Sequence, residues 1–221
     1  MIKKLLSRLS EFEKMIFISM VFTTVMVAMR YLYTDEKEYL FYPWNLFLAT
    51  VPLFFSRQLQ RYKKFNLNVT MLLFCWLLFL PNAPYIITDL FHFEERPLIP
   101  FWFDLLIVIS GAWNGIALCI TSLLHVERFL AKHIKPRWRF PSTIALITLC
   151  SYGIYLGRYK RYNSWNIITR PEDLAHTMLS HIAEPVEHAQ AWLFTLSFAM
   201  LLAIMYFTVK KIPGMLKVDQ G

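Results

Sequence analysis

LPNAPYIITDLFHF, residues 80–93, ends a long apolar run and interrupts it with two prolines. Pro81 and Pro84 each remove a backbone donor and disfavour helical angles in the preceding residue, so they predict a broken helix. About 16 residues before the break cover most of a bilayer core at ~1.5 Å per residue. The break is therefore expected near a membrane boundary, where Asn82 could satisfy freed backbone groups.

The composition indicates a membrane protein. Of the 221 residues, 57% are hydrophobic and 17% are charged, which is too apolar for an ordinary soluble domain. The net charge of +8 comes from Lys and Arg beside apolar segments, so no nucleic-acid partner is expected. The three cysteines lie inside apolar runs, which argues against a disulfide framework or a thiol metal cluster. We expect residues 1–221 to form a single all-α membrane domain.

Apolar segments of nearly membrane length predict a polytopic transmembrane helical bundle of about six spans, the third of them broken. The spans are expected near 15–33, 40–56, 67–88, 101–124, 142–158 and 188–209. Arg30, within the first span, is expected to extend its charge outward. Residues 171–183 predict an amphipathic helix on the outer surface, with a capping box that starts at Thr169.

The distribution of basic residues predicts the orientation. Most Lys and Arg fall in the amino terminus, in 57–66, in 125–141 and after Val209. We expect the chain to lie in the plasma membrane. The positive-inside bias then places both termini in the cytoplasm. The helix ends that carry the informative polar residues then face outward.

Asp89, His92 and Asp104 form the first candidate site and are predicted to be catalytic. Asp89 and His92 lie three residues apart, hence on one helix face, and Asp104 follows a short loop. Such a group can act as base and acid or bind a divalent cation, although metal and cofactor stay undetermined. A histidine of the last outer segment, at 176, 181 or 188, could complete it. Alternatively, Asp89 pairs with an arginine, His92 forms hydrogen bonds at the membrane interface, and the other histidines are solvated.

GRYKRYNSWN, residues 157–166, forms the second candidate site. Arg158 and Arg161 lie one turn apart and can clamp a phosphate or carboxylate, while aromatic rings hold a sugar or an acyl neck. Alternatively, the two arginines form salt bridges to the carboxylates of the first site, and both interpretations can hold together. The predicted substrate-binding residues are Arg158, Arg161, Asn163, Trp165, Asn82 and Asn45.

Asn114 is the strongly polar residue near the middle of the fourth expected span. Gly111 and Gly115 beside it would let a neighbouring helix approach closely, and Asn114 would bond across to that helix. We interpret this group as structural.

Four blocks of the sequence resemble, in the same order, the signature blocks of a bacterial membrane-protein family catalogued as a domain of unknown function, number thirteen-sixty-one. The blocks are WNLFLA at 44–49, LPNAPYIITDLFH at 80–92, the Trp102 and Asp104 pair, and GRYKRYNSWNI at 157–167. The resemblance covers about residues 40–170. The last family block often reads NSWD, whereas this chain has Asn166. The resemblance implies a polytopic bacterial membrane protein and no mechanism.

Three functions remain open from the sequence. The first is a membrane-embedded enzyme or binder that acts at the outer leaflet on an anionic lipid-linked or envelope substrate. The second is a small transporter, because broken helices line transport sites. The third is a non-catalytic assembly subunit. The expected partners are the lipid bilayer and, under the first function, an anionic lipid or lipid-linked substrate. The sequence does not determine protein partners or whether the chain is an enzyme.

Overall fold

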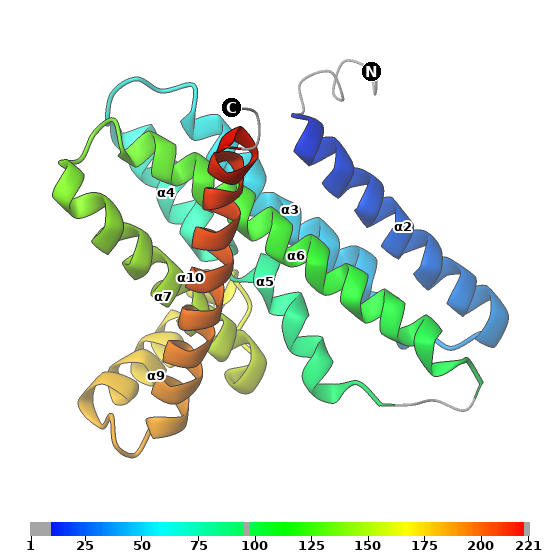
Figure 1. Cartoon of the computed structure of the whole chain (residues 1–221). Helices are drawn as coiled ribbons and strands as arrows, with labels where there is room; N and C mark the ends of the chain where they lie inside the picture. Colours follow the sequence, from blue (N-terminus) through cyan, green and yellow to red (C-terminus); the bar gives the residue numbers. More distant parts are fainter. Residues whose placement is uncertain (1–9, 95–97, 219–221) are drawn as a thin grey trace.

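The computed structural model describes residues 10–94 and 98–218, except for the side chains of His92 and of residues 213–218. All regular structure in the described residues is helical, as the sequence predicts (Figure 1). The helices are α2 (Glu11–Thr34), α3 (Phe41–Leu59), α4 (Leu67–Phe79), α5 (Asn82–Tyr85), the 3₁₀ helix η1 (Ile86–His92), α6 (Phe101–Leu130), α7 (Pro136–Lys160), α8 (Asn166–Thr169), α9 (Pro171–Ala183) and α10 (Ala189–Val218).

Five helical segments within the described residues are long and apolar enough to cross a membrane, which identifies a multi-pass membrane protein. They are Glu11–Thr34, Leu67–Phe91, Phe101–Leu130, Pro136–Lys160 and Ala189–Ile212. The second expected span, 40–56, corresponds to α3, which has 19 residues but is not among the five. Asn45, Arg57 and Gln58 lower its mean hydropathy. In Figure 1, α3 runs beside α6 between the same two ends of the molecule.

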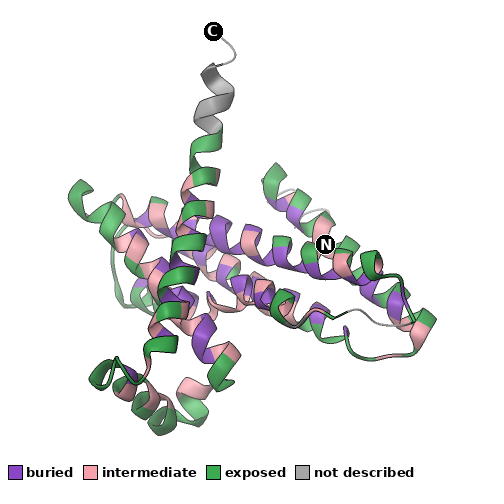
Figure 2. Ribbon diagram, turned by 60° about the horizontal axis from the view of Figure 1, so that its bottom comes forward, coloured by how far each residue is buried: buried purple, intermediate pink, exposed green. Residues whose placement is uncertain are grey.

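Helix α6 is the centre of the bundle. In the most apolar 18 residues of α6, 61% of the residues are buried, against 28% in the corresponding stretches of α2 and α10 (Figure 2). Gly111 allows this packing, because a Cβ there would lie 2.5 Å from Cε1 of Tyr42 in α3. Asn114 Nδ2 donates to Thr23 Oγ1 of α2 at 2.9 Å. The predicted bond from Asn114 across to a neighbouring helix is confirmed.

The helix break lies at the prolines, but the expected departure of the preceding residues from helical angles is wrong: Leu80 keeps φ −53° and ψ −41°, and Ala83 lies inside α5. The chain leaves the α-helix after Phe79 and continues as α5 and then as the 3₁₀ helix η1. Pro81 and Pro84 lack the N–H groups that would bond the carbonyls of Leu77 and Leu80 in a continuous helix. The Ala83 N–H donates to the Leu80 carbonyl at 3.1 Å, so the Phe79 carbonyl needs another donor. Asn82 Nδ2 donates to the carbonyl of Phe79 at 3.0 Å, and Ser164 Oγ donates to that of Leu78 at 2.9 Å. Asn82 therefore makes the kind of backbone contact that the sequence predicts.

Helix α9 begins differently from the expectation. Thr169 belongs to α8, and the residue preceding α9 is Arg170, whose side chain makes no capping hydrogen bond. The predicted capping box is therefore wrong. The Thr169 hydroxyl instead accepts from Asn166 Nδ2 at 3.0 Å and donates to the Trp165 carbonyl at 3.4 Å. The helix itself is present, beside the lower ends of α7 and α10 in Figure 1.

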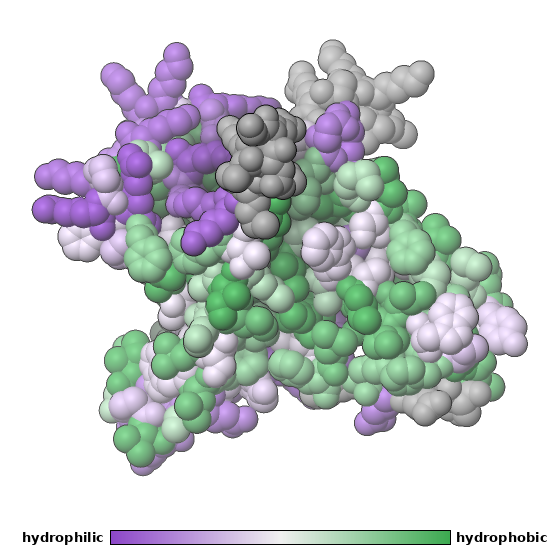
Figure 3. All heavy atoms as spheres, viewed as in Figure 1, coloured by the Kyte–Doolittle hydropathy of each residue, from purple (hydrophilic) through white to green (hydrophobic). Residues whose placement is uncertain are grey.

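Hydrophilic side chains gather at one end of the molecule. Figure 3 shows them at the end where α3 meets α4 and α6 meets α7, with an apolar band across the middle. The start of α2 and the last turns of α10 lie toward this same end (Figure 1). An apolar band between polar ends is what a bilayer requires of a protein that crosses it.

Candidate functional site

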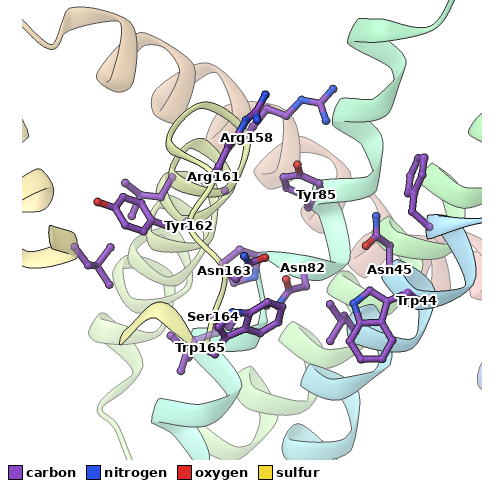
Figure 4. Close-up of a pocket in the computed structure, with 18 of the residues that line it drawn as sticks. Trp44, Asn45, Asn82, Tyr85, Arg158, Arg161, Tyr162, Asn163, Ser164 and Trp165 are labelled. Atoms are coloured by element: carbon purple, nitrogen blue, oxygen red, sulfur yellow. Dashed lines mark hydrogen bonds between the residues drawn. The ribbon is translucent and has the colours of Figure 1, made fainter. Parts of the chain in front are cut away.

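A cavity of about 640 Å³ opens where the start of α3, the broken end of α4 and the end of α7 meet (Figure 4). This volume lies within the range of small-molecule sites, about 300–1,000 Å³. Most of the residues selected from the sequence line it: Asn45, Asn82, Asp89, Arg158, Arg161, Asn163 and Trp165. The structure thus brings together one predicted catalytic residue and all predicted substrate-binding residues, although their roles stay predictions.

The polar segment after α7 is attached to the helix break. Ser164 Oγ accepts a hydrogen bond from Asn82 Nδ2 at 2.9 Å while it donates to the Leu78 carbonyl. One pair of side chains therefore satisfies the broken helix and holds residues 163–165 against it. Because the carbonyls at the end of α4 need partners, this attachment positions Asn163 and Trp165 at the cavity.

Arg158 forms an ion pair inside the cavity. Its Nη1 donates to Asp89 Oδ1 at 3.2 Å, and the side chains are 15% and 13% exposed. The guanidinium carbon also lies 5.8 Å from the centre of the Tyr85 ring. The alternative in which Asp89 pairs with Arg158 is confirmed. A partly buried pair of this kind can line a pocket and still exchange partners with an anion.

Arg161 ends α7 in the left-handed conformation, with φ 58°. Its backbone N–H and that of Tyr162 both donate to the Leu156 carbonyl. A non-glycine residue pays roughly 1–2 kcal/mol for this conformation, which turns the chain back toward the cavity. The guanidinium is exposed and bonds to no carboxylate among the described residues.

Asn166 stabilises the turn that follows. Its Oδ1 accepts from the Asn163 backbone N–H at 2.6 Å, and its amide group donates to Thr169. An amide supplies both an acceptor and a donor, so the turn needs no carboxylate at this position. Asn166 does not line the cavity.

Two tryptophans stand at the mouth of the cavity. Trp44, at the start of α3, is 56% exposed, and Trp165 is 43% exposed. Figure 4 shows both rings beside Asn45 and Asn82. Tryptophan favours the boundary between bilayer and water because its ring is apolar and its N–H is polar. The position of the rings agrees with a cavity at that boundary.

Asp104 lies in a different cluster. It is 3% exposed and accepts from Arg30 Nε at 2.8 Å and from Arg30 Nη2 at 3.3 Å. Arg30 also bonds to Glu36 at 3.1 Å and lies over the Tyr39 ring. Asp104 does not line the cavity, and the salt bridge expected between it and the arginines of α7 is wrong.

The same cluster corrects the expectation for Arg30. Its side chain is 1% exposed and points at Asp104 rather than extending outward. Burial and the charge of Asp104 raise the pKa of Tyr39 to about 12. We attribute a structural role to this cluster, because a buried arginine requires a charge partner.

None of the histidines whose side chains the structure describes lines the cavity. The side chain of His92 lies outside the described part of the structure. On α9, His176 is exposed and His181 is fully buried, and neither lines the cavity. No group of three or more His, Cys, Asp or Glu side chains that could hold a metal occurs among the described residues.

The sequence analysis did not identify two of the residues that line the cavity, Tyr85 and Leu174. The Arg158 guanidinium lies over the ring of Tyr85, and Leu174 of α9 is also among the residues that line the cavity. Tyr85 ends the PNAPY run, so its place beside the break was a usable signal. Leu174 has no such signal, because an apolar residue on an amphipathic helix points equally well to bilayer or core.

Comparison with protein families finds one match, described as "Protein of unknown function (DUF1361)", over residues 44–205. Neither the curated proteins nor the solved structures provide a match. The family match spans α3 to α10 and includes every residue that lines the described cavity except Phe41.

Proposed function

The chain belongs to this family of unknown function, and we propose that it binds the phosphate or carboxylate headgroup of a membrane amphiphile in the cavity between α3, α5 and α7. The observation that carries the proposal is the pairing of Arg158 and Arg161 at one end of a cavity with exposed tryptophans at its mouth (Figure 4). Arginine suits this ligand because its planar fork matches phosphate and carboxylate oxygens.

The two arginines would act differently. Arg161 has no carboxylate partner among the described residues and is ready to accept an anion. Arg158 already holds Asp89, so an entering headgroup would share it with that carboxylate. Asp89 would then stand beside the bound headgroup, which is where a base or acid must be for any reaction of that group. Processing of the ligand would therefore fall to Asp89 and not to Asp104.

The opposite wall of the cavity suits an apolar chain. Phe41 and Leu48 of α3 and Leu78 of α4 line it, and Phe41 is 43% exposed. These helices pack side by side, and α4 is part of an apolar span. A ligand with a charged head and an apolar tail could place its head at the arginines and its tail along this wall.

Arg161→Gly should weaken binding of phosphatidic acid about ten- to a hundredfold, because charge-assisted hydrogen bonds contribute about 1.5–3 kcal/mol. Glycine adopts the left-handed conformation freely, so the fold should stay intact or gain about 1 kcal/mol. Titration of the purified protein in detergent, followed by native mass spectrometry, measures the affinity. Diacylglycerol, which lacks the phosphate, should bind weakly to both proteins.

The chain offers a matched control in Asp35, its other described non-glycine residue with positive φ, 57°. Asp35→Gly should change stability in the same direction and leave binding of phosphatidic acid unaltered. Asp89→Asn should bind at least about fivefold more tightly, since a like charge beside the headgroup is removed. Equal affinity in Arg161→Gly and the wild-type protein would exclude this binding site.

We further propose that the cavity faces the outside of a bacterial plasma membrane, with both termini in the cytoplasm and α3 as a sixth crossing. The basic connections at the opposite end support this orientation. Asn163→Cys should react with a membrane-impermeant maleimide in intact cells, whereas Lys63→Cys should react only after lysis. Both positions are exposed in the structure. The reverse labelling pattern would invert the topology and contradict an outer-leaflet ligand.

A further inference from the structure

Helix α9 forms one wall of the cavity and is attached to it at two points. Leu174 lines the cavity and packs against a cluster that includes Tyr155 and Leu156 of α7. The Thr177 hydroxyl lies 3.0 Å from that of Tyr162, which also lines the cavity. The position of α9 therefore determines how far the cavity is closed on this side.

His181 joins the end of α9 to two membrane-crossing helices. Its side chain has 0% exposure, and its Nδ1 lies 2.8 Å from the Tyr152 hydroxyl of α7. Its backbone carbonyl accepts from Trp192 Nε1 of α10 at 2.9 Å. The rings of Tyr152 and Trp192 stack with centroids 5.8 Å apart. His181 thus occupies the junction of three helices.

The surroundings of His181 do not favour a positive charge. Its Nε2 is buried without a hydrogen-bond partner among the described residues. The titratable and charged groups that face it are Tyr152, Tyr155 and Lys160 of α7 and His188 before α10, whose ring centroid lies 4.6 Å away. No described carboxylate bonds to it. Burial, and after it His188 and Lys160, lowers the pKa of His181.

We propose that α9 is a proton-controlled wall of the cavity: protonation of His181 separates α9 from α7 and α10 and opens the cavity where Leu174 lines it. A charged imidazole cannot stay in a buried site that contains a second histidine and no carboxylate. The movement would withdraw Leu174 and break the bond between Thr177 and Tyr162. Its effect on ligand entry rests on the proposed function of the cavity; the movement itself does not.

The direction of the pH dependence follows from proton linkage. The packed state holds His181 neutral below its ordinary pKa of about 6.5, whereas released α9 exposes it to water and restores that value. Between the lowered pKa and about 6.5, the released state binds more protons. Docking of α9 is therefore complete above about pH 7 and weakens as the pH falls through 6.5, by at most about tenfold per pH unit for one proton.

Hydrogen–deuterium exchange of the full chain in lipid nanodiscs, with mass spectrometry of peptides from 171–183, tests the movement without any ligand. After correction for the intrinsic exchange rate, protection of α9 should fall about tenfold between pH 7.5 and pH 5.5 in the wild-type protein. His176→Gln, at an exposed position of the same helix, should show the same fall. His181→Gln should show no dependence on pH.

His188→Gln provides a second variant in case His181→Gln leaves α9 unprotected at every pH. Removal of the neighbouring imidazole should reduce the fall in protection, because one source of repulsion is gone. The proposal is overturned if wild-type protection is equal at both pH values, or if both variants keep the full fall. Phosphatidic acid binding to Arg161→Gly tests the cavity separately, so failure of one proposal is distinguishable from failure of the other.

Discussion

Arg30→Met is expected to lower the free energy of unfolding by about 3–5 kcal/mol, since it leaves a buried carboxylate without its charge partner. Arg30 and Asp104 make two hydrogen bonds, and their side chains are 1% and 4% exposed. The pair also ties α2 to the first turn of α6. Denaturant unfolding of the purified protein in detergent micelles measures the change.

The double variant Arg30→Met with Asp104→Leu is the control for this prediction. Replacing a whole buried ion pair by apolar side chains of similar size is often neutral, so most of the lost stability should return. Glu36, at 37% exposure of its side chain, can be solvated once Arg30 is absent. A single variant within about 1 kcal/mol of the wild-type protein would contradict a buried pair between these residues.

Gly115→Ala is expected to destabilise the protein by about 3 kcal/mol or more. An added Cβ would lie 2.1 Å from the carbonyl oxygen of Ala83, which is backbone and cannot rotate away. Helix α6 and the segment after the break would have to separate. Because that segment carries Asn82, which bonds to Ser164 and so holds residues 163–165 at the cavity, phosphatidic acid binding should fall together with stability. Unfolding and binding are measured on the same sample.

Gly157→Ala is the matched control, because its new Cβ would meet Tyr85 Cε2 at 3.3 Å, a side-chain atom that can shift. Alanine also gains up to about 1 kcal/mol over glycine within a helix. We expect this variant to stay within about 1 kcal/mol of the wild-type protein. If both glycine variants lost the same stability, the close approach of α6 to Ala83 would not explain the effect.

Local sequence signals predicted a large part of the fold. Apolar segments of sufficient length placed the helices, and the two prolines placed the break after Phe79. The polar residues of the cavity could also be predicted from the sequence, because Asn45, Asn82 and Arg158 all occur near predicted helix ends on one side of the membrane. Charge and length carry this information along the chain, with no need to know which helices touch.

Partners across the bundle were not predictable in the same way. Arg30 was expected to extend outward, but it pairs with Asp104, 74 residues later. His181 was grouped with solvated histidines, but it is fully buried. Both errors have one cause: the rotation of a helix about its axis decides which side chains face inward, and strongly apolar helices give a weak signal of that rotation.

The sequence by itself determined that this chain is an all-α multi-pass membrane protein with a broken helix and a polar, arginine-bearing end. Length, apolarity and proline chemistry act locally, so they can be read without a structure. Only the tertiary structure decided that Arg158 holds Asp89, that Arg161 stays without a carboxylate partner among the described residues, and that Asp104 belongs to Arg30. These ion pairs depend on how each helix is rotated about its axis and how closely the helices approach. Rotation of a helix by one residue position would bring different charged side chains together.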